Sequence, residues 1–229
     1  MARWKVEITG PADQLKELGQ LLPTEYRVEV LNHKHLLVGE GFANLDDPEE
    51  VDRQASTILQ AANTIGAWKL GWRKPLLVNT IKEYDEDGIC IRSQAFCECS
   101  ICALPRLQIK AAPTGSEGLE KTVELVRSNP DIEEALSYFL KEQPDFWKLY
   151  EVIRDDVGTD EDIVNMGWAS PVDLDRFKGS INSKEVLGES ARHARSKYPP
   201  PRKPMSLIEL RTFAEQLLNH WIEGFLLLR

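Results

Sequence analysis

The chain has 229 residues, of which 42% are hydrophobic and 28% are charged, and its formal net charge is −9. This composition is typical of a globular protein with a packed core and excludes a fibrous or wholly disordered chain. The negative charge argues against nonspecific binding of the whole chain to nucleic acid or acidic membranes, and no apolar run reaches the ~20 residues that a membrane-spanning helix needs.

The N-terminal part predicts a strand, a helix and a hairpin. Trp4, Val6 and Ile8 alternate with polar residues, which predicts a half-buried strand that ends at Gly10-Pro11. Leucines at helical spacing follow up to Pro23. Residues 26–30 alternate again, and after a polar turn at 32–34 an apolar stretch returns, so we expect a β-hairpin here.

A second helix and a second hairpin are predicted next. Asp47-Pro48 is typical of a helix start, because aspartate caps free backbone N–H groups and proline is favoured at the first helical position. The apolar face of this helix runs from Val51 to Ile65. Strand-like residues at 76–84, a tight turn at 85–88 and a return strand at 89–102 complete a small, mainly antiparallel sheet of about five strands with two helices, an α+β fold.

The sequence predicts two domains. Residues 110–115 interrupt the hydrophobic periodicity with small residues and turn formers, which indicates a linker. We therefore expect an α+β sheet domain at 1–109 and an all-α helical bundle domain at 116–229. In the second domain, apolar faces recur at helical spacing in several short segments joined by short loops, a pattern that favours a bundle.

The last predicted helix is long and amphipathic. It begins at Ser206, which forms a capping box with Glu209. An apolar stripe at three- and four-residue steps follows, made of Leu210, Phe213, Ala214, Leu217, Trp221, Phe225 and Leu228. Such a stripe must be buried within the bundle or against a second copy, and we expect a homo-oligomer formed through this helix.

Four cysteines, Cys90, Cys97, Cys99 and Cys102, lie in one short segment. They have the ligand type for a zinc site, but only Cys99 and Cys102 show the Cys-x-x-Cys spacing, so buried free thiols are the alternative. No other cofactor is expected. The N-terminus also lacks the long apolar stretch of a signal peptide, so we expect a cytoplasmic protein without disulfides or membrane contact.

One basic loop, 189–198, is the best candidate for a site. Arg192 and Arg195 have the geometry to bind phosphate or carboxylate in a bidentate manner, and His193 is able to act as a general acid or base near neutral pH. These residues would suit cleavage of RNA without a metal. The alternative is structural, with both arginines paired to acidic helices and the histidine at a helix end.

Several segments of the predicted helical domain resemble known proteins. Phe146 to Gly158, Arg176-Phe177, Asn182-Ser183, Gly188, Ala191 to His193 and Pro204 to Leu207 together resemble an uncharacterised family of bacterial proteins. The helical half also resembles HEPN-type bundles of abortive-infection and toxin proteins. That resemblance implies RNA cleavage by an arginine and a histidine near the last helix. The family places four to six residues between the two, whereas Arg192 and His193 are adjacent here.

Two functions are therefore expected as alternatives. The first is a noncatalytic interaction or regulatory protein of the bacterial cytoplasm, which self-associates and has a possible protein partner. The second is a HEPN-like, metal-independent ribonuclease of the toxin or phage-defence type, with RNA as its substrate and with His193, Arg192 and Arg195 as its catalytic residues. No enzyme signature in the sequence decides between them.

Overall fold

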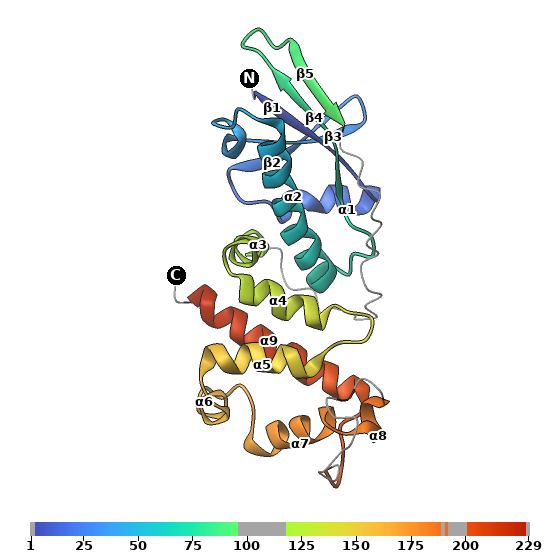
Figure 1. The fold of residues 1–229 in the computed structure, drawn as a ribbon, viewed down its shortest axis with the longest axis vertical. Helices are drawn as coiled ribbons and strands as arrows, with labels where there is room; N and C mark the ends of the chain where they lie inside the picture. Colours follow the sequence, from blue (N-terminus) through green and yellow to red (C-terminus); the bar gives the residue numbers. More distant parts are fainter. Residues whose placement is uncertain (1–2, 96–117, 189–190, 192–200, 228–229) are drawn as a thin grey trace. The chain divides into compact units, whose positions relative to one another are not determined.

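The computed structural model describes residues 3–95, 118–188, 191 and 201–227 (Figure 1). The chain divides into two compact units, 1–128 and 129–229. The predicted linker at 110–115 lies outside the described residues, as does the predicted return strand beyond Ala95. The division between the units falls after Ser128, because the first helix beyond the predicted linker packs against a helix of the first unit.

The first unit is built around a five-stranded antiparallel sheet, which confirms the predicted α+β class. The strand order is β2-β3-β1-β4-β5. Two short 3-10 helices, η1 (Leu18–Gln20) and η2 (Glu40–Phe42), and a short π-helix, η3 (Gly66–Leu70), join some of its elements. The elements are β1 (Trp4–Thr9), α1 (Ala12–Glu17), β2 (Tyr26–Leu31), β3 (Lys34–Gly39), α2 (Pro48–Ile65), β4 (Leu77–Tyr84), β5 (Cys90–Ala95) and α3 (Leu119–Ser128).

The connectivity interleaves two β-α-β units. The strands β1 and β2 flank β3, while β3 and β4 flank β1, which is the split β-α-β arrangement with β5 added at one edge. In this register Val6 lies opposite both Leu37 and Ile81. All three side chains are almost fully buried, and α2 packs on β1 and β4 (Figure 1). The core of this unit therefore lies between α2 and the centre of the sheet.

Local capping fixes where α2 begins. The Asp47 side chain accepts a hydrogen bond from the Glu49 backbone N–H at 3.0 Å, and Pro48 occupies the first turn, as predicted. Near the other end, the buried Asn63 side chain bonds both backbone groups of Leu76, at 2.9 and 3.0 Å. These two bonds attach the end of α2 to the residue just before β4, and they orient the exposed side of the helix.

The second unit is helical. Its helices are α4 (Pro130–Phe139), α5 (Phe146–Val157), α6 (Asp160–Asn165), α7 (Pro171–Ile181), α8 (Lys184–Leu187) and α9 (Leu207–Leu227). The predicted start of α9 is confirmed, because Ser206 exchanges hydrogen bonds with Glu209 there. Ser170 caps α7 in the same unit. No helix in the described ranges is long and apolar enough to cross a membrane.

The apolar stripe of α9 is covered within its own unit. Leu210, Ala214, Leu217 and Trp221 are at most 2% exposed, and the Trp221 indole N–H donates to Asp156 on α5 at 2.7 Å. Figure 1 shows α9 running beside α5. Leu228 lies outside the described residues. Phe213 and Phe225 of the stripe are only partly buried, and self-association through α9 stays a prediction.

Candidate functional site

Most of the site residues predicted from the sequence lie outside the described residues. These are Arg192, His193 and Arg195 of the basic loop, together with Cys97, Cys99 and Cys102. Cys90 is described, and it is an exposed free thiol at the start of β5. Among the residues that the structure describes, no three or more His, Cys, Asp or Glu side chains form a group that would hold a metal ion.

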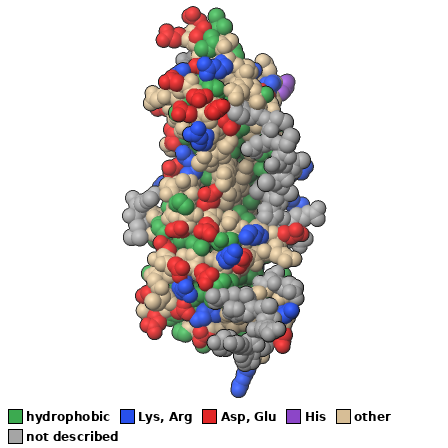
Figure 2. All heavy atoms as spheres, in the orientation of Figure 1, with side chains coloured by type: hydrophobic (Ala, Val, Ile, Leu, Met, Phe, Trp, Pro, Cys, Tyr) green, Lys and Arg blue, Asp and Glu red, His purple; other side chains and the backbone are tan. Residues whose placement is uncertain are grey.

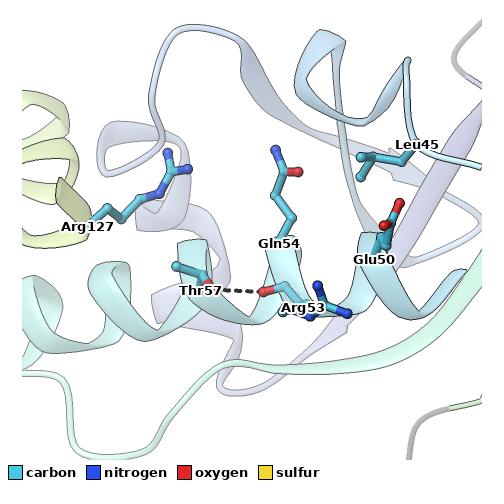
Figure 3. A pocket seen from close by; sticks show the side chains of 6 residues that line it. All are labelled: Leu45, Glu50, Arg53, Gln54, Thr57 and Arg127. Carbon is cyan, nitrogen blue, oxygen red and sulfur yellow. Dashed lines mark hydrogen bonds between the residues drawn. The ribbon is translucent and has the colours of Figure 1, made fainter. Parts of the chain in front are cut away.

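The structure reveals a polar groove beside α2 that the sequence did not indicate. The groove has a volume of about 300 Å³. We call it the α2 groove, and it is lined by Leu45, Glu50, Arg53, Gln54, Thr57 and Arg127 (Figure 3). A second depression, of about 530 Å³, shares Arg53 and Thr57 with it and extends to Gln94 on β5. The exposed side of α2 thus separates two neighbouring hollows.

Arg127 forms one wall of the α2 groove. It lies in the last turn of α3, and its Nη1 donates to Glu124 Oε2 at 2.8 Å and lies 3.9 Å from Glu25 Oε1. The side chain is 18% exposed. Its Nε atom is buried and has no hydrogen-bond partner. The Nε–H of this guanidinium therefore has no acceptor among the described residues.

Two hydrogen bonds fix the side chain of Gln54. Its side-chain amide donates to the Tyr26 hydroxyl and to the Gly41 carbonyl, the latter at 3.2 Å. Burial raises the pKa of Tyr26 above its ordinary value, so this hydroxyl stays neutral at physiological pH. Because these bonds fix the amide, Gln54 presents a constant polar surface to the groove (Figure 3).

Arg53 adds a second guanidinium. It is exposed on α2, and its backbone carbonyl accepts a hydrogen bond from Thr57 Oγ1 at 2.8 Å (Figure 3). Among the described residues, no side chain pairs with its guanidinium. Arginine has five N–H donors in a planar fork that matches a carboxylate. With Arg127 it gives the α2 groove a set of donors suited to an anionic group.

A second group with a perturbed pKa lies in the second unit. Tyr150 donates to Asp160, and Asp160 also forms an ion pair with Lys178. Burial first, and then the hydrogen bond to Asp160, raise the pKa of Tyr150 well above its ordinary value. Burial alone would raise the pKa of Asp160, but the hydrogen bonds from Lys178 and Tyr150 lower it. All three groups have partners, so this cluster joins α5, α6 and α7 rather than forming a site.

The comparisons with known proteins give no further guide. No family model matches the sequence, and no curated protein and no solved structure matches it either. In the sequence, the one local signal for it was the run of amide and hydroxyl side chains on the exposed side of α2. Arg127 comes from a distant segment, which folding brings beside this helix.

Proposed function

We propose that the chain is a noncatalytic interaction protein of the bacterial cytoplasm. In this proposal, the first unit binds an acidic segment of a protein partner in the α2 groove. The observation that carries the proposal is the buried Arg127 Nε, which lacks a hydrogen-bond partner at the wall of the groove. The bacterial origin and the cytoplasmic location in this proposal rest on the sequence resemblance.

An acceptor in the groove would remove an energetic cost. A buried donor without a partner costs ~1–3 kcal/mol. A carboxylate that accepts from Arg127 would recover this cost, and Arg53 would strengthen the contact through a charge-assisted hydrogen bond. The neighbouring Thr57 hydroxyl and Gln54 amide would offer polar contacts to the flanking backbone of a peptide.

The charges around the groove favour a protein segment over a nucleic acid. Glu50 lines the groove, and Glu49 and Asp52 line the adjoining depression. These carboxylates would repel a continuous phosphate backbone, whereas a short acidic segment can place its charge beside the arginines alone. On the face drawn in Figure 2, acidic and basic side chains are interspersed over the described part of the chain. Direct binding of RNA is therefore not part of this proposal.

Fluorescence anisotropy with a short labelled peptide that carries two adjacent glutamates between neutral residues tests this binding. We expect the full chain to bind the peptide, with an affinity that falls as salt is added. Arg53→Ala removes one guanidinium from an exposed helix position and should weaken binding about tenfold, or ~1.4 kcal/mol. The matched control is Arg73→Ala, which removes the same charge from an exposed position of the same unit outside the groove. Equal loss in both variants would show nonspecific attraction and would refute the proposal.

Noncatalytic function has its own test. We expect purified chain to leave single-stranded RNA intact over hours, and a His193→Ala variant to behave as the parent does. A gel assay of end-labelled RNA measures this directly. If the parent cuts RNA and His193→Ala does not, the ribonuclease alternative replaces the noncatalytic one.

A further inference from the structure

The second unit contains a pocket of about 340 Å³ at the start of α9. Its volume is at the small end of pockets that hold small molecules (~300–1,000 Å³). The pocket is formed by the segment between α4 and α5, the short helix α8 and the first turns of α9. We call it the α9 pocket, and it is lined by Glu142, Gln143, Pro144, Phe146, Val186, Leu187, Leu207 and Arg211.

Five of the eight lining residues are apolar, and the polar ones are Glu142, Gln143 and Arg211. Pro144, Phe146, Val186, Leu187 and Leu207 supply the apolar walls. Leu207 is 57% exposed, although it is a large hydrophobic residue. Exposed apolar surface inside a concavity is the usual property of a ligand site rather than of an ordinary surface.

Arg211 is incompletely satisfied in this setting. Its Nε and Nη2 atoms are both buried and have no hydrogen-bond partner. The guanidinium carbon lies 5.4 Å from the centre of the Phe139 ring, a contact that offsets only part of the lost hydration. Burial lowers the pKa of Arg211, and the charge of Glu215 opposes this shift. An anion beside the guanidinium would supply what these N–H groups lack.

The other polar groups of the pocket do not fulfil this role. Glu142 lines the pocket but is exposed, and it forms no ion pair with Arg211. Gln143 has an interaction of its own. The single carboxylate of Glu142 would also disfavour a ligand with two or more negative charges, such as a phosphate monoester.

We propose that the α9 pocket binds a small aliphatic carboxylate. Its hydrocarbon chain lies against Phe146, Val186 and Leu187, and its carboxylate accepts hydrogen bonds from Arg211. Because Arg211 itself lines the pocket, a rotation of its long side chain turns the guanidinium edge toward the ligand. This binding is independent of the α2 groove and of the partner proposed for it.

Isothermal titration calorimetry with sodium octanoate tests the proposal on the full chain. Octan-1-ol has the same chain without the charge, and acetate has the charge without the chain. We expect octanoate to bind at a single site and both comparison ligands to bind at least tenfold more weakly. Equal binding of octan-1-ol would show an apolar hollow in which Arg211 has no role, and it would overturn the proposal. Absence of octanoate binding would overturn it as well.

Three variants locate the binding. Arg211→Met keeps an unbranched side chain and removes the donors, so octanoate affinity should fall at least tenfold. Glu142→Gln removes the competing negative charge and should strengthen binding about twofold. The control is Arg202→Met, at an exposed position of the same unit outside the pocket, which should bind as the parent does. Unchanged affinity in Arg211→Met, or an equal loss in Arg202→Met, would refute the assignment.

A fourth variant keeps the test valid if Arg211→Met fails to fold. Leu187→Trp fills the pocket from α8 and leaves Arg211 in place, so octanoate binding should be lost in a protein whose circular dichroism is unchanged. Normal binding by this variant would place the ligand elsewhere.

Discussion

Replacing Arg211 with methionine should stabilise the free protein. Two buried nitrogen donors without partners, Nε and Nη2, cost ~1–3 kcal/mol each, and because this guanidinium is only partly buried we take the lower end, a total of ~2 kcal/mol. The substitution also removes the contact with the Phe139 ring, which is worth ~1 kcal/mol. Methionine retains the packing of the aliphatic stem. The free energy of unfolding should therefore rise by ~1 kcal/mol.

Urea unfolding followed by tryptophan fluorescence measures this change. For a chain of this length, ~1 kcal/mol corresponds to an increase of roughly 2–4 °C in the melting temperature. The control variant Arg202→Met should stay within ~0.5 kcal/mol of the parent. If Arg211→Met is destabilised by ~1 kcal/mol or more, the guanidinium is well paired in the folded protein, and the reasoning about its unsatisfied donors is wrong.

Two further predictions concern the ends of helices. The pKa of Glu209 is lowered from 4.5 to about 2, mainly by the hydrogen bond from the Ser206 backbone, so its stabilising effect is complete above pH 4.5 and is lost as the pH falls toward 2. The stability difference between the parent and Glu209→Gln should accordingly shrink over this range in acid titrations followed by circular dichroism, and a constant difference would contradict it. Asn63→Ala leaves both backbone groups of Leu76 without their partner and should cost ~2–4 kcal/mol in urea unfolding. The partly exposed neighbour Thr64→Ala should cost less than ~0.5 kcal/mol, and equal losses would contradict the role of Asn63.

The order of elements could be predicted because it depends on local signals. The alternation around Val6 specifies a strand whatever its partners are. Asp47-Pro48 and Ser206 with Glu209 satisfy backbone donors of their own helices, so their effect is contained within a few residues. Each of these predictions is confirmed. The same reasoning predicted the part of the α9 stripe that is buried, whereas Phe213 and Phe225 are only partly buried.

What covers a buried surface could not be predicted in the same way. The stripe around Trp221 was compatible with a second copy, and only tertiary packing shows that α5 of the same unit provides the cover. The order of the strands could not be predicted either, because several long-range strand pairings are compatible with the same alternation of apolar and polar residues. The sequence placed α3 in the second domain, whereas in the structure it packs on α2 of the first unit. Its apolar face has the same pattern whichever helix covers it, so the pattern alone does not identify the partner.

The two candidate sites were missed for a physical reason that also supports them. In the sequence, Arg127 and Arg211 are ordinary polar-face residues of amphipathic helices, and the acids three or four residues away, Glu124 and Glu215, give no sign that some of the N–H groups stay unpaired. Elsewhere in the first unit, folding does provide partners for charges at low exposure: Glu83 lies 2.9 Å from Arg3, and Glu7 lies 2.8 Å from Lys34.

Compared with these paired charges, Arg127 and Arg211 differ in two respects: they keep buried donors without a partner, and they lie at the wall of a pocket. The indole N–H of Trp68 is also unpaired, but Trp68 lies in the core, where a bulky apolar ring gains more from burial than its single donor loses. A guanidinium has no comparable apolar gain. Its unsatisfied donors therefore favour an anionic ligand at each pocket, and the two pockets differ in what surrounds the charge. Polar side chains beside Arg127 suit an acidic peptide, and apolar walls beside Arg211 suit an aliphatic carboxylate.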